Sequence, residues 1–117
     1  MIATRHYQAA DGTPLEVGVD APRQVGSEEW QCEFRVGSHV ECASGVDALQ
    51  ALQGAISGIR YRLNELPPVR WASGTELGDT GIEPIVPQGF GLAWSRHIGQ
   101  VIERELTAFV AQHRGSR

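Results

Sequence analysis

Two cysteines and two histidines are the side chains in this sequence best suited to bind a metal ion. Cys32, His39, Cys42 and His97 give the spacing C-x6-H-x2-C and a distant second histidine. Structural zinc sites usually combine short paired spacings such as C-x2–4-C, and both cysteines also fit the alternating apolar face of a hairpin. We therefore expect two free, buried thiols, and we predict no metal site and no cofactor.

The same residues could support nucleophilic catalysis, but the surroundings of Cys32 argue against it. A reactive thiolate needs an exposed, electropositive setting, whereas Cys32 stands between Trp30 and Phe34. Ser57 and Ser95 lack the G-x-S-x-G turn of a nucleophilic serine. The sequence also contains no H-E-x-x-H, no G-x-x-x-x-G-K and no G-x-G-x-x-G that opens a helix. It therefore identifies no catalytic residue and leans against an enzyme.

Charge is distributed unevenly in the second half of the chain. No basic residue occurs between Trp71 and Ser95, whereas Glu76, Asp79 and Glu83 all lie there. An acidic segment beside an aromatic side chain can steer and anchor a basic partner. We therefore predict a partner-binding surface formed by Trp71, Glu76, Asp79 and Glu83. The alternative is a solvated loop with ordinary acids.

These acids belong to residues 74–92, which contain five glycines and two prolines and too little periodicity for a helix or a strand. Irregular connections of this length are often binding loops or lids. Ile82, Ile85, Val86 and Phe90 would hold the segment against the core. A purely structural loop remains the alternative to a binding loop.

One long amphipathic helix, residues 45–66, organises the rest of the chain. Six apolar residues recur at alternating steps of three and four and predict a buried stripe: Leu49, Leu52, Ile56, Ile59, Leu63 and Leu66. Asp47 is the expected N-cap, with Gln50 reaching back to complete it, and Pro67 prevents the helix from continuing. Gly54 and Gly58 each cost about 1 kcal/mol relative to alanine, so we expect a sheet to approach closely there.

Alternating patterns predict strands at residues 2–9, 15–19 and 29–36, whereas residues 21–28 read as a loop. A three-residue hairpin loop at residues 37–39 would set Val36 opposite Val40 and bury Cys42. A two-residue loop would instead turn Val40 and Cys42 outward, because a slip of one residue reverses every side chain.

Two further elements follow the long helix. Residues 69–73 predict a short fifth strand or an extended segment that contains Trp71. Residues 93–113 return to helical spacing and predict a second helix beside the first. Its expected buried face consists of Ile98, Val101, Ile102, Leu106, Phe109 and Val110.

The composition favours one acidic domain. The chain has 117 residues, and ten basic residues against fourteen acidic ones give a formal charge of −4. This balance disfavours nucleic acid, whose phosphates need a basic patch, and leaves basic proteins as candidate partners. No charged-then-apolar leader opens the chain, and no apolar run approaches the ~20 residues that span a bilayer. We expect a cytoplasmic protein that does not bind membranes.

The segments WQCEFR (residues 30–35) and GVDALQAL (residues 45–52) resemble a family of small, largely uncharacterised bacterial proteins. That family has a W-x-C-x-F/Y-R strand followed by a G-V-D-x-x-Q-A-L helix start. The motifs are structural, so the resemblance implies a fold more directly than an activity. Proteins that look like this, with a late loop rich in glycine and proline, often serve as immunity proteins that neutralise a cognate bacterial toxin.

These patterns together predict a single two-layer α+β domain over residues 1–117, with an antiparallel sheet of four to five strands packed against two helices. The expected function is non-enzymatic protein binding, as an immunity or regulatory protein that blocks a basic toxin domain through its acidic surface. One alternative is a small enzyme or ligand-binding domain with a pocket under residues 74–92. Another is a structural subunit of a homo-oligomer.

Overall fold

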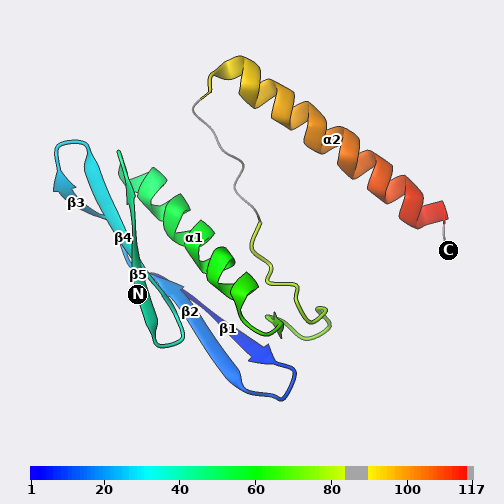
Figure 1. Cartoon of the computed structure of the whole chain (residues 1–117), viewed down its shortest axis with the longest axis horizontal. Helices are drawn as coiled ribbons and strands as arrows, with labels where there is room; N and C mark the ends of the chain where they lie inside the picture. The colour runs from blue at the N-terminus through cyan, green and yellow to red at the C-terminus, as the bar shows by residue number, and fades with distance from the viewer. Residues whose placement is uncertain (84–89, 116–117) are drawn as a thin grey trace. The chain divides into compact units, whose positions relative to one another are not determined.

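A computed structural model describes residues 1–83 and 90–115 of the chain (Figure 1). The elements in order are β1 (Ala3–Ala9), β2 (Pro14–Val19), β3 (Arg23–Gly26), β4 (Glu29–Val36), β5 (His39–Gly45), α1 (Ala48–Glu65), β6 (Val69–Arg70) and α2 (Leu92–Gly115). The chain divides into two units, Met1–Ile85 and Val86–Arg117. The first unit holds the sheet and α1, and the second holds α2.

The six strands form one antiparallel sheet, which confirms the predicted α+β class and comes close to the expected strand number. β4 pairs with β5 along its whole length on one side. On its other side β4 pairs with β3 through its first residues and with β2 through its last. β1 then pairs with β2, and the short β6 pairs with β1.

The strand that the sequence did not predict is β3, which lies in residues 21–28, where a loop was expected. That prediction is wrong because Pro22 precedes the strand, so its missing amide hydrogen interrupts no rung of the ladder. Arg23 pairs with Gln31, and the register shifts between Gln24 and Gly26. The strand is therefore short and irregular, and its apolar alternation is too brief to be recognised in the sequence.

The hairpin between β4 and β5 also differs from the prediction. Val36 pairs with His39, so the loop has two residues, Gly37 and Ser38, in place of three. Gly37 has a φ of +62°, as expected for the first central position of a two-residue hairpin turn. In this register Val40 and Cys42 point away from α1 and are exposed. The prediction of a buried Cys42 is therefore wrong, whereas Cys32 is fully buried as expected.

The predicted ends of α1 are confirmed. The Asp47 carboxylate accepts a hydrogen bond from the Gln50 amide at 2.7 Å, and the Gln50 side chain accepts one from the Val46 amide at 2.8 Å. The first bond satisfies an amide that the first turn leaves free, and the second fixes the residue that precedes the cap. The helix ends at Glu65 with Leu66 as its C-cap, directly before Pro67, as expected.

The buried face of α1 is rotated from the predicted stripe toward the small residues beside it. Ala51, Ala55, Ile59 and Leu63 are the buried residues of the helix, whereas Leu49 is 64% exposed. Ile56 and Leu66 are also exposed. The face is centred on small residues because the helix lies close against β4 and β5, where long side chains would keep it away.

Both helical glycines mark this close approach, as predicted. A Cβ atom at Gly58 would lie 2.5 Å from the Phe34 ring, and one at Gly54 would lie 3.2 Å from the Ala43 Cβ. Phe34 itself is buried, and together with Tyr7, Val17 and Val36 it belongs to the core between the sheet and α1. The core of the first unit therefore depends on two positions that lack a side chain.

The second predicted helix is present as α2, with ends within two residues of those expected. Its expected apolar stripe is largely exposed in the structure, with Ile102, Leu106 and Phe109 all at least half exposed. The Phe109 and His113 rings stack with centroids 3.9 Å apart. The packing of this helix beside α1, and a single domain over residues 1–117, stay predictions.

Candidate functional site

Trp71 follows directly after β6 and packs against Arg5 and Gly81. The Arg5 guanidinium lies over the indole ring, with its carbon 4.6 Å from the ring centroid. This distance is within the range of an attractive cation–π contact. Gly81 lies against the same ring, and a Cβ atom there would come within 2.6 Å of indole atoms. The ring is 38% exposed, so it is fixed in position and still open to a partner.

The segment from Trp71 to Glu83, here called the Trp71 loop, contains no helix or strand, as predicted for its part of residues 74–92. It is nevertheless ordered by its own backbone hydrogen bonds. The Thr75 amide donates to the Ala72 carbonyl at 3.1 Å, and the Gly78 amide donates to the Val69 carbonyl at 2.8 Å. These bonds give the backbone of the loop a defined shape.

Two side chains of β1 hold the far end of the Trp71 loop. The Tyr7 hydroxyl donates to the Thr80 carbonyl at 2.7 Å, and Arg5 Nη1 donates to the Thr80 and Gly81 carbonyls at 3.3 and 3.2 Å. Burial raises the pKa of Tyr7 above its ordinary value, so the phenol stays protonated and able to donate. Ile82 packs against the core, as expected. Ile85 and Val86, predicted to do the same, lie outside the described residues.

The predicted acids remain exposed on this loop. Within the described part of the chain, Glu76, Asp79 and Glu83 take part in no side-chain ion pair. Asp79 accepts a hydrogen bond from the Gly81 amide at 3.0 Å, which shapes the turn and leaves its charge uncompensated. Leu77 is also exposed beside them. The loop thus combines an aromatic, an aliphatic and three acidic side chains.

Arg5 is the residue of this site that sequence reasoning missed. The predicted surface contained no basic residue, because only neighbours along the chain were considered. The pairing of β1 with β6 brings Arg5 beside Trp71, although 66 positions separate them. A signal for it was present: Arg5 alternates in phase with Tyr7 and so falls on the inward face of its strand, where a charged residue needs a partner.

A cavity of about 490 Å³ lies on the α1 side of the Trp71 loop. Its apolar walls come from Val17 and Val19 of β2, Ile56 and Ile59 of α1, and Ile82 of the loop. Arg5 and Glu83 supply the charges at its margin. The predicted surface is therefore divided between two cavities. Glu83 borders this cavity, whereas Trp71 borders a different one.

The second cavity has a volume of about 560 Å³ and is mainly polar. Trp71 forms one wall, and His6, Gln8 and Arg70 contribute polar side chains. Trp71 is thus the first residue of the acidic loop and also borders a hollow that contains a basic side chain. This position suits a ring that a partner covers from the hollow.

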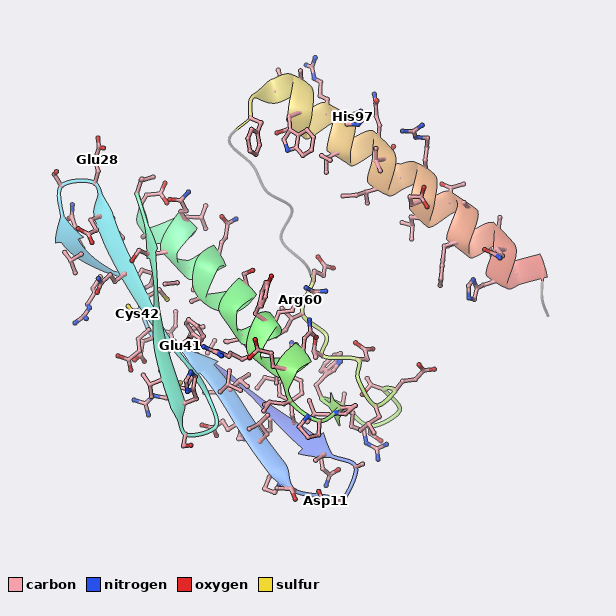
Figure 2. The ribbon with its side chains drawn as sticks, viewed as in Figure 1. Asp11, Glu28, Glu41, Cys42, Arg60 and His97 are labelled. Atoms are coloured by element: carbon pink, nitrogen blue, oxygen red, sulfur yellow. The ribbon has the colours of Figure 1, made fainter. Side chains whose placement is uncertain are left out.

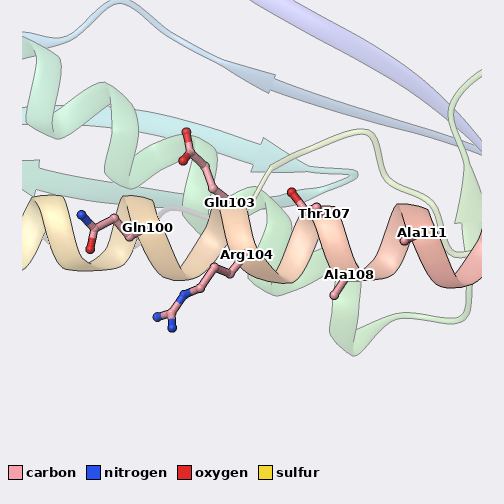
Figure 3. A pocket seen from close by; sticks show the side chains of 6 residues that line it. All are labelled: Gln100, Glu103, Arg104, Thr107, Ala108 and Ala111. Carbon is pink, nitrogen blue, oxygen red and sulfur yellow. The ribbon is translucent and has the colours of Figure 1, made fainter.

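The described residues of α2 offer weaker candidates. Figure 3 shows side chains projecting from its polar face, among them Gln100, Glu103 and Arg104. One helix surface encloses no ligand, so this depression is no binding pocket. At the start of α2, Phe90 and Trp94 pack edge to face with centroids 5.8 Å apart. Their rings border an apolar hollow of about 460 Å³ that also reaches His97.

The two cysteines of the sheet that were considered as metal ligands do not converge. The Cys32 thiol is buried under α1 and donates to the Asp20 carbonyl at 3.2 Å, and burial raises its pKa. Cys42 lies on the outer face of β5, where Figure 2 labels it next to Glu41. Since the two thiols are on opposite faces of one sheet, they cannot bind the same ion. Residues 1–83 and 90–115 contain no cluster of three or more His, Cys, Asp or Glu side chains with metal-binding geometry.

Comparison with known protein families shows which family the chain belongs to. It belongs to the family described as a domain of unknown function, DUF6968, whose model matches residues 3–75. The match therefore spans β1 through β6 and the first residues of the Trp71 loop, including Arg5, Tyr7 and Trp71. Comparisons with curated proteins and with solved structures return no match. Among the described residues, neither helix combines the length and apolar character needed to cross a bilayer.

Proposed function

We propose that this protein is a non-enzymatic protein-binding domain that uses the Trp71 loop to bind a basic partner. The observation that carries the proposal is the ordered state of the loop, which Tyr7 and Arg5 hold to β1 through the Thr80 and Gly81 carbonyls. A loop that is already ordered loses little conformational entropy on binding. Trp71 and Leu77 supply apolar contact area, and aromatic side chains are enriched among the residues that dominate binding energy.

The proposed partner is a basic toxin domain that this protein neutralises as an immunity protein. Glu76, Asp79 and Glu83 support this choice because they are exposed and lack ion-pair partners in the described residues. The net charge of −4 favours the same class of partner. Complementary charge of this kind acts mainly on the rate of association and on specificity.

The experiment expresses the open reading frame next to this gene, alone and together with this protein, and measures growth and association of the two products. Toxicity that co-expression relieves would support the proposal. A harmless neighbour, or toxicity that co-expression leaves unchanged, would count against the immunity role.

With such a partner in hand, the triple variant Glu76→Gln/Asp79→Asn/Glu83→Gln removes three charges at nearly constant size. We expect association to slow and to lose its salt dependence, because screening acts on long-range attraction. The control Glu28→Gln/Glu103→Gln/Glu105→Gln removes the same charge at exposed positions elsewhere. Equal effects of both variants would show that only the net charge matters and that the Trp71 loop is not the interface.

A second candidate function rests on the 490 Å³ cavity, whose volume falls in the range of small-molecule sites. In this case the domain binds an apolar ligand with a polar end near Arg5. The test measures fluorescence enhancement of 1-anilinonaphthalene-8-sulfonate. Ile56→Trp, which fills the cavity, should abolish binding, whereas Leu49→Trp on the exposed side of the same helix should not. Binding that survives Ile56→Trp rules this cavity out.

A further inference from the structure

The edge of the sheet formed by β5 is open for pairing. Among the described residues β5 pairs with β4 alone, and it offers seven residues without proline or register shift. Natural proteins usually protect such edges with short strands, bulges, proline or charged side chains. β3 shows three of these features, since it is short, has a register shift and follows Pro22. β6 has only two residues.

The backbone groups of β5 that face this edge can be identified from the ladder. His39 pairs with Val36 across the two-residue turn, so alternate residues of β5 from His39 onward exchange hydrogen bonds with β4. The Glu33 carbonyl fits this alternation, because it accepts from the Asp20 amide on the opposite side of β4. The amides and carbonyls of Val40, Cys42 and Ser44 therefore point out of the sheet.

We propose that β5 pairs with β5 of a second copy of this chain, antiparallel and centred on Cys42. This register overlaps all seven residues of the strand and uses every outward amide and carbonyl. It places Cys42 opposite Cys42 of the second copy, Val40 opposite Ser44 of the second copy, and Glu41 opposite Ala43 of the second copy. The two sheets then form one continuous sheet.

The proposed register also keeps like charges apart. Glu41 is the one acidic residue of β5, and it already pairs with Arg62 of α1 through both carboxylate oxygens. In the proposed register it faces alanine, so no like charges are opposed. A register centred on Glu41 would oppose two carboxylates, which is destabilising, and would shorten the overlap. These differences select Cys42 as the centre.

The first test measures the oligomeric state of the full chain by sedimentation over a range of concentrations. We expect a concentration-dependent dimer. Val40→Lys should weaken the dimer at least about tenfold, because lysine on an edge strand opposes pairing. Val25→Lys is the matched control, since Val25 lies on β3 with nearly the same exposure, 47% against 50% for Val40. A chain that stays monomeric throughout, or equal weakening by both variants, overturns the proposal.

The second test reads the register by cross-linking with diamide, which accepts the two protons and two electrons released when two thiols form a disulfide. Opposed residues of an antiparallel pair have Cα atoms about 4.5 to 5.5 Å apart, which a disulfide can bridge. Wild type should therefore form a covalent dimer through Cys42. In Cys42→Ser/Val40→Cys the new thiols lie four residues out of register, about 13 Å apart, and should not react. Cross-linking of this variant at the wild-type rate overturns the register. Failure here leaves the Trp71 loop proposal standing, because the two surfaces share no residue.

Discussion

α1 and α2 have similar apolar periodicity but differ in what they bury. α1 covers Ala51, Ala55 and Ile59 against the sheet of its own unit, whereas within the second unit the stripe of α2 leaves Ile102 and Leu106 exposed. Helical spacing therefore predicted both helices, but it did not predict which side chains are covered. That depends on the shape of the opposing surface. In α1 the small residues permit contact with β4 and β5, and the larger residues beside them are displaced to the margin.

The largest expected effect contrasts the isoleucines of the two helices. Ile59 is 4% exposed, so Ile59→Ala should lower the free energy of unfolding by roughly 2 to 5 kcal/mol through the cavity it leaves. Ile102 is 50% exposed, and Ile102→Ala should cost less than about 0.5 kcal/mol. Urea unfolding followed by circular dichroism measures both. Similar losses for the two variants would mean that the stripe of α2 is covered in solution and that the contrast is wrong.

Replacing a glycine by alanine should change stability less, and in opposite directions in the two helices. Gly58→Ala would place a Cβ 2.5 Å from the Phe34 ring, so we expect it to destabilise by about 1 to 3 kcal/mol. A Cβ at Gly99 meets no atom within 4 Å, and Gly99→Ala should stabilise α2 by up to about 1 kcal/mol through helix propensity alone. Thermal unfolding and helix content measure the two changes. A neutral Gly58→Ala would show that Phe34 moves aside and that the close approach is not needed.

The smallest expected effect concerns the charges that hold α1 to β5. Arg62, helped by His39, lowers the pKa of Glu41 from 4.5 to about 2. Because this pKa is depressed in the folded state, the contribution is complete above about pH 4.5 and is lost as the pH falls toward 2. Solvent exposure keeps it small. Glu41→Gln should therefore flatten the acid side of the stability profile, whereas Glu103→Gln on α2 should not. Identical acid profiles for wild type and Glu41→Gln would contradict the prediction.

Sequence reasoning predicted most of the fold, because the determining interactions are local. Asp47 caps α1 through an amide three residues away, and the Asp11 carboxylate accepts from the Thr13 amide within the β1–β2 turn. The register of β5 was not predictable in this way. It depends on the length of the turn, because the positive φ of Gly37 allows a loop of only two residues. Apolar alternation could not decide the length, since both possible registers placed some apolar residues inward.

The candidate site was predicted less well than the fold. The sequence located Trp71 and the exposed acids, because a missing basic residue and an excess of glycine can be read from neighbouring positions. It did not locate Arg5, and it did not predict that Glu83 borders a separate cavity from Trp71. Both features arise from contacts between segments far apart in the chain, which periodicity alone does not describe.

The way in which β1 holds the Trp71 loop also sets how this surface can evolve. Tyr7 and Arg5 bind main-chain carbonyls, which every residue type provides, so the anchor places no demand on the side chains at positions 76, 77 and 83. Asp79 and Gly81 are the exceptions, because the Asp79 carboxylate accepts a hydrogen bond from the Gly81 amide and any Cβ at Gly81 would strike Trp71. Mutations at the three free positions can therefore change partner preference without unfolding the protein. A lineage under pressure from a changing partner could diversify these positions while the scaffold stays the same.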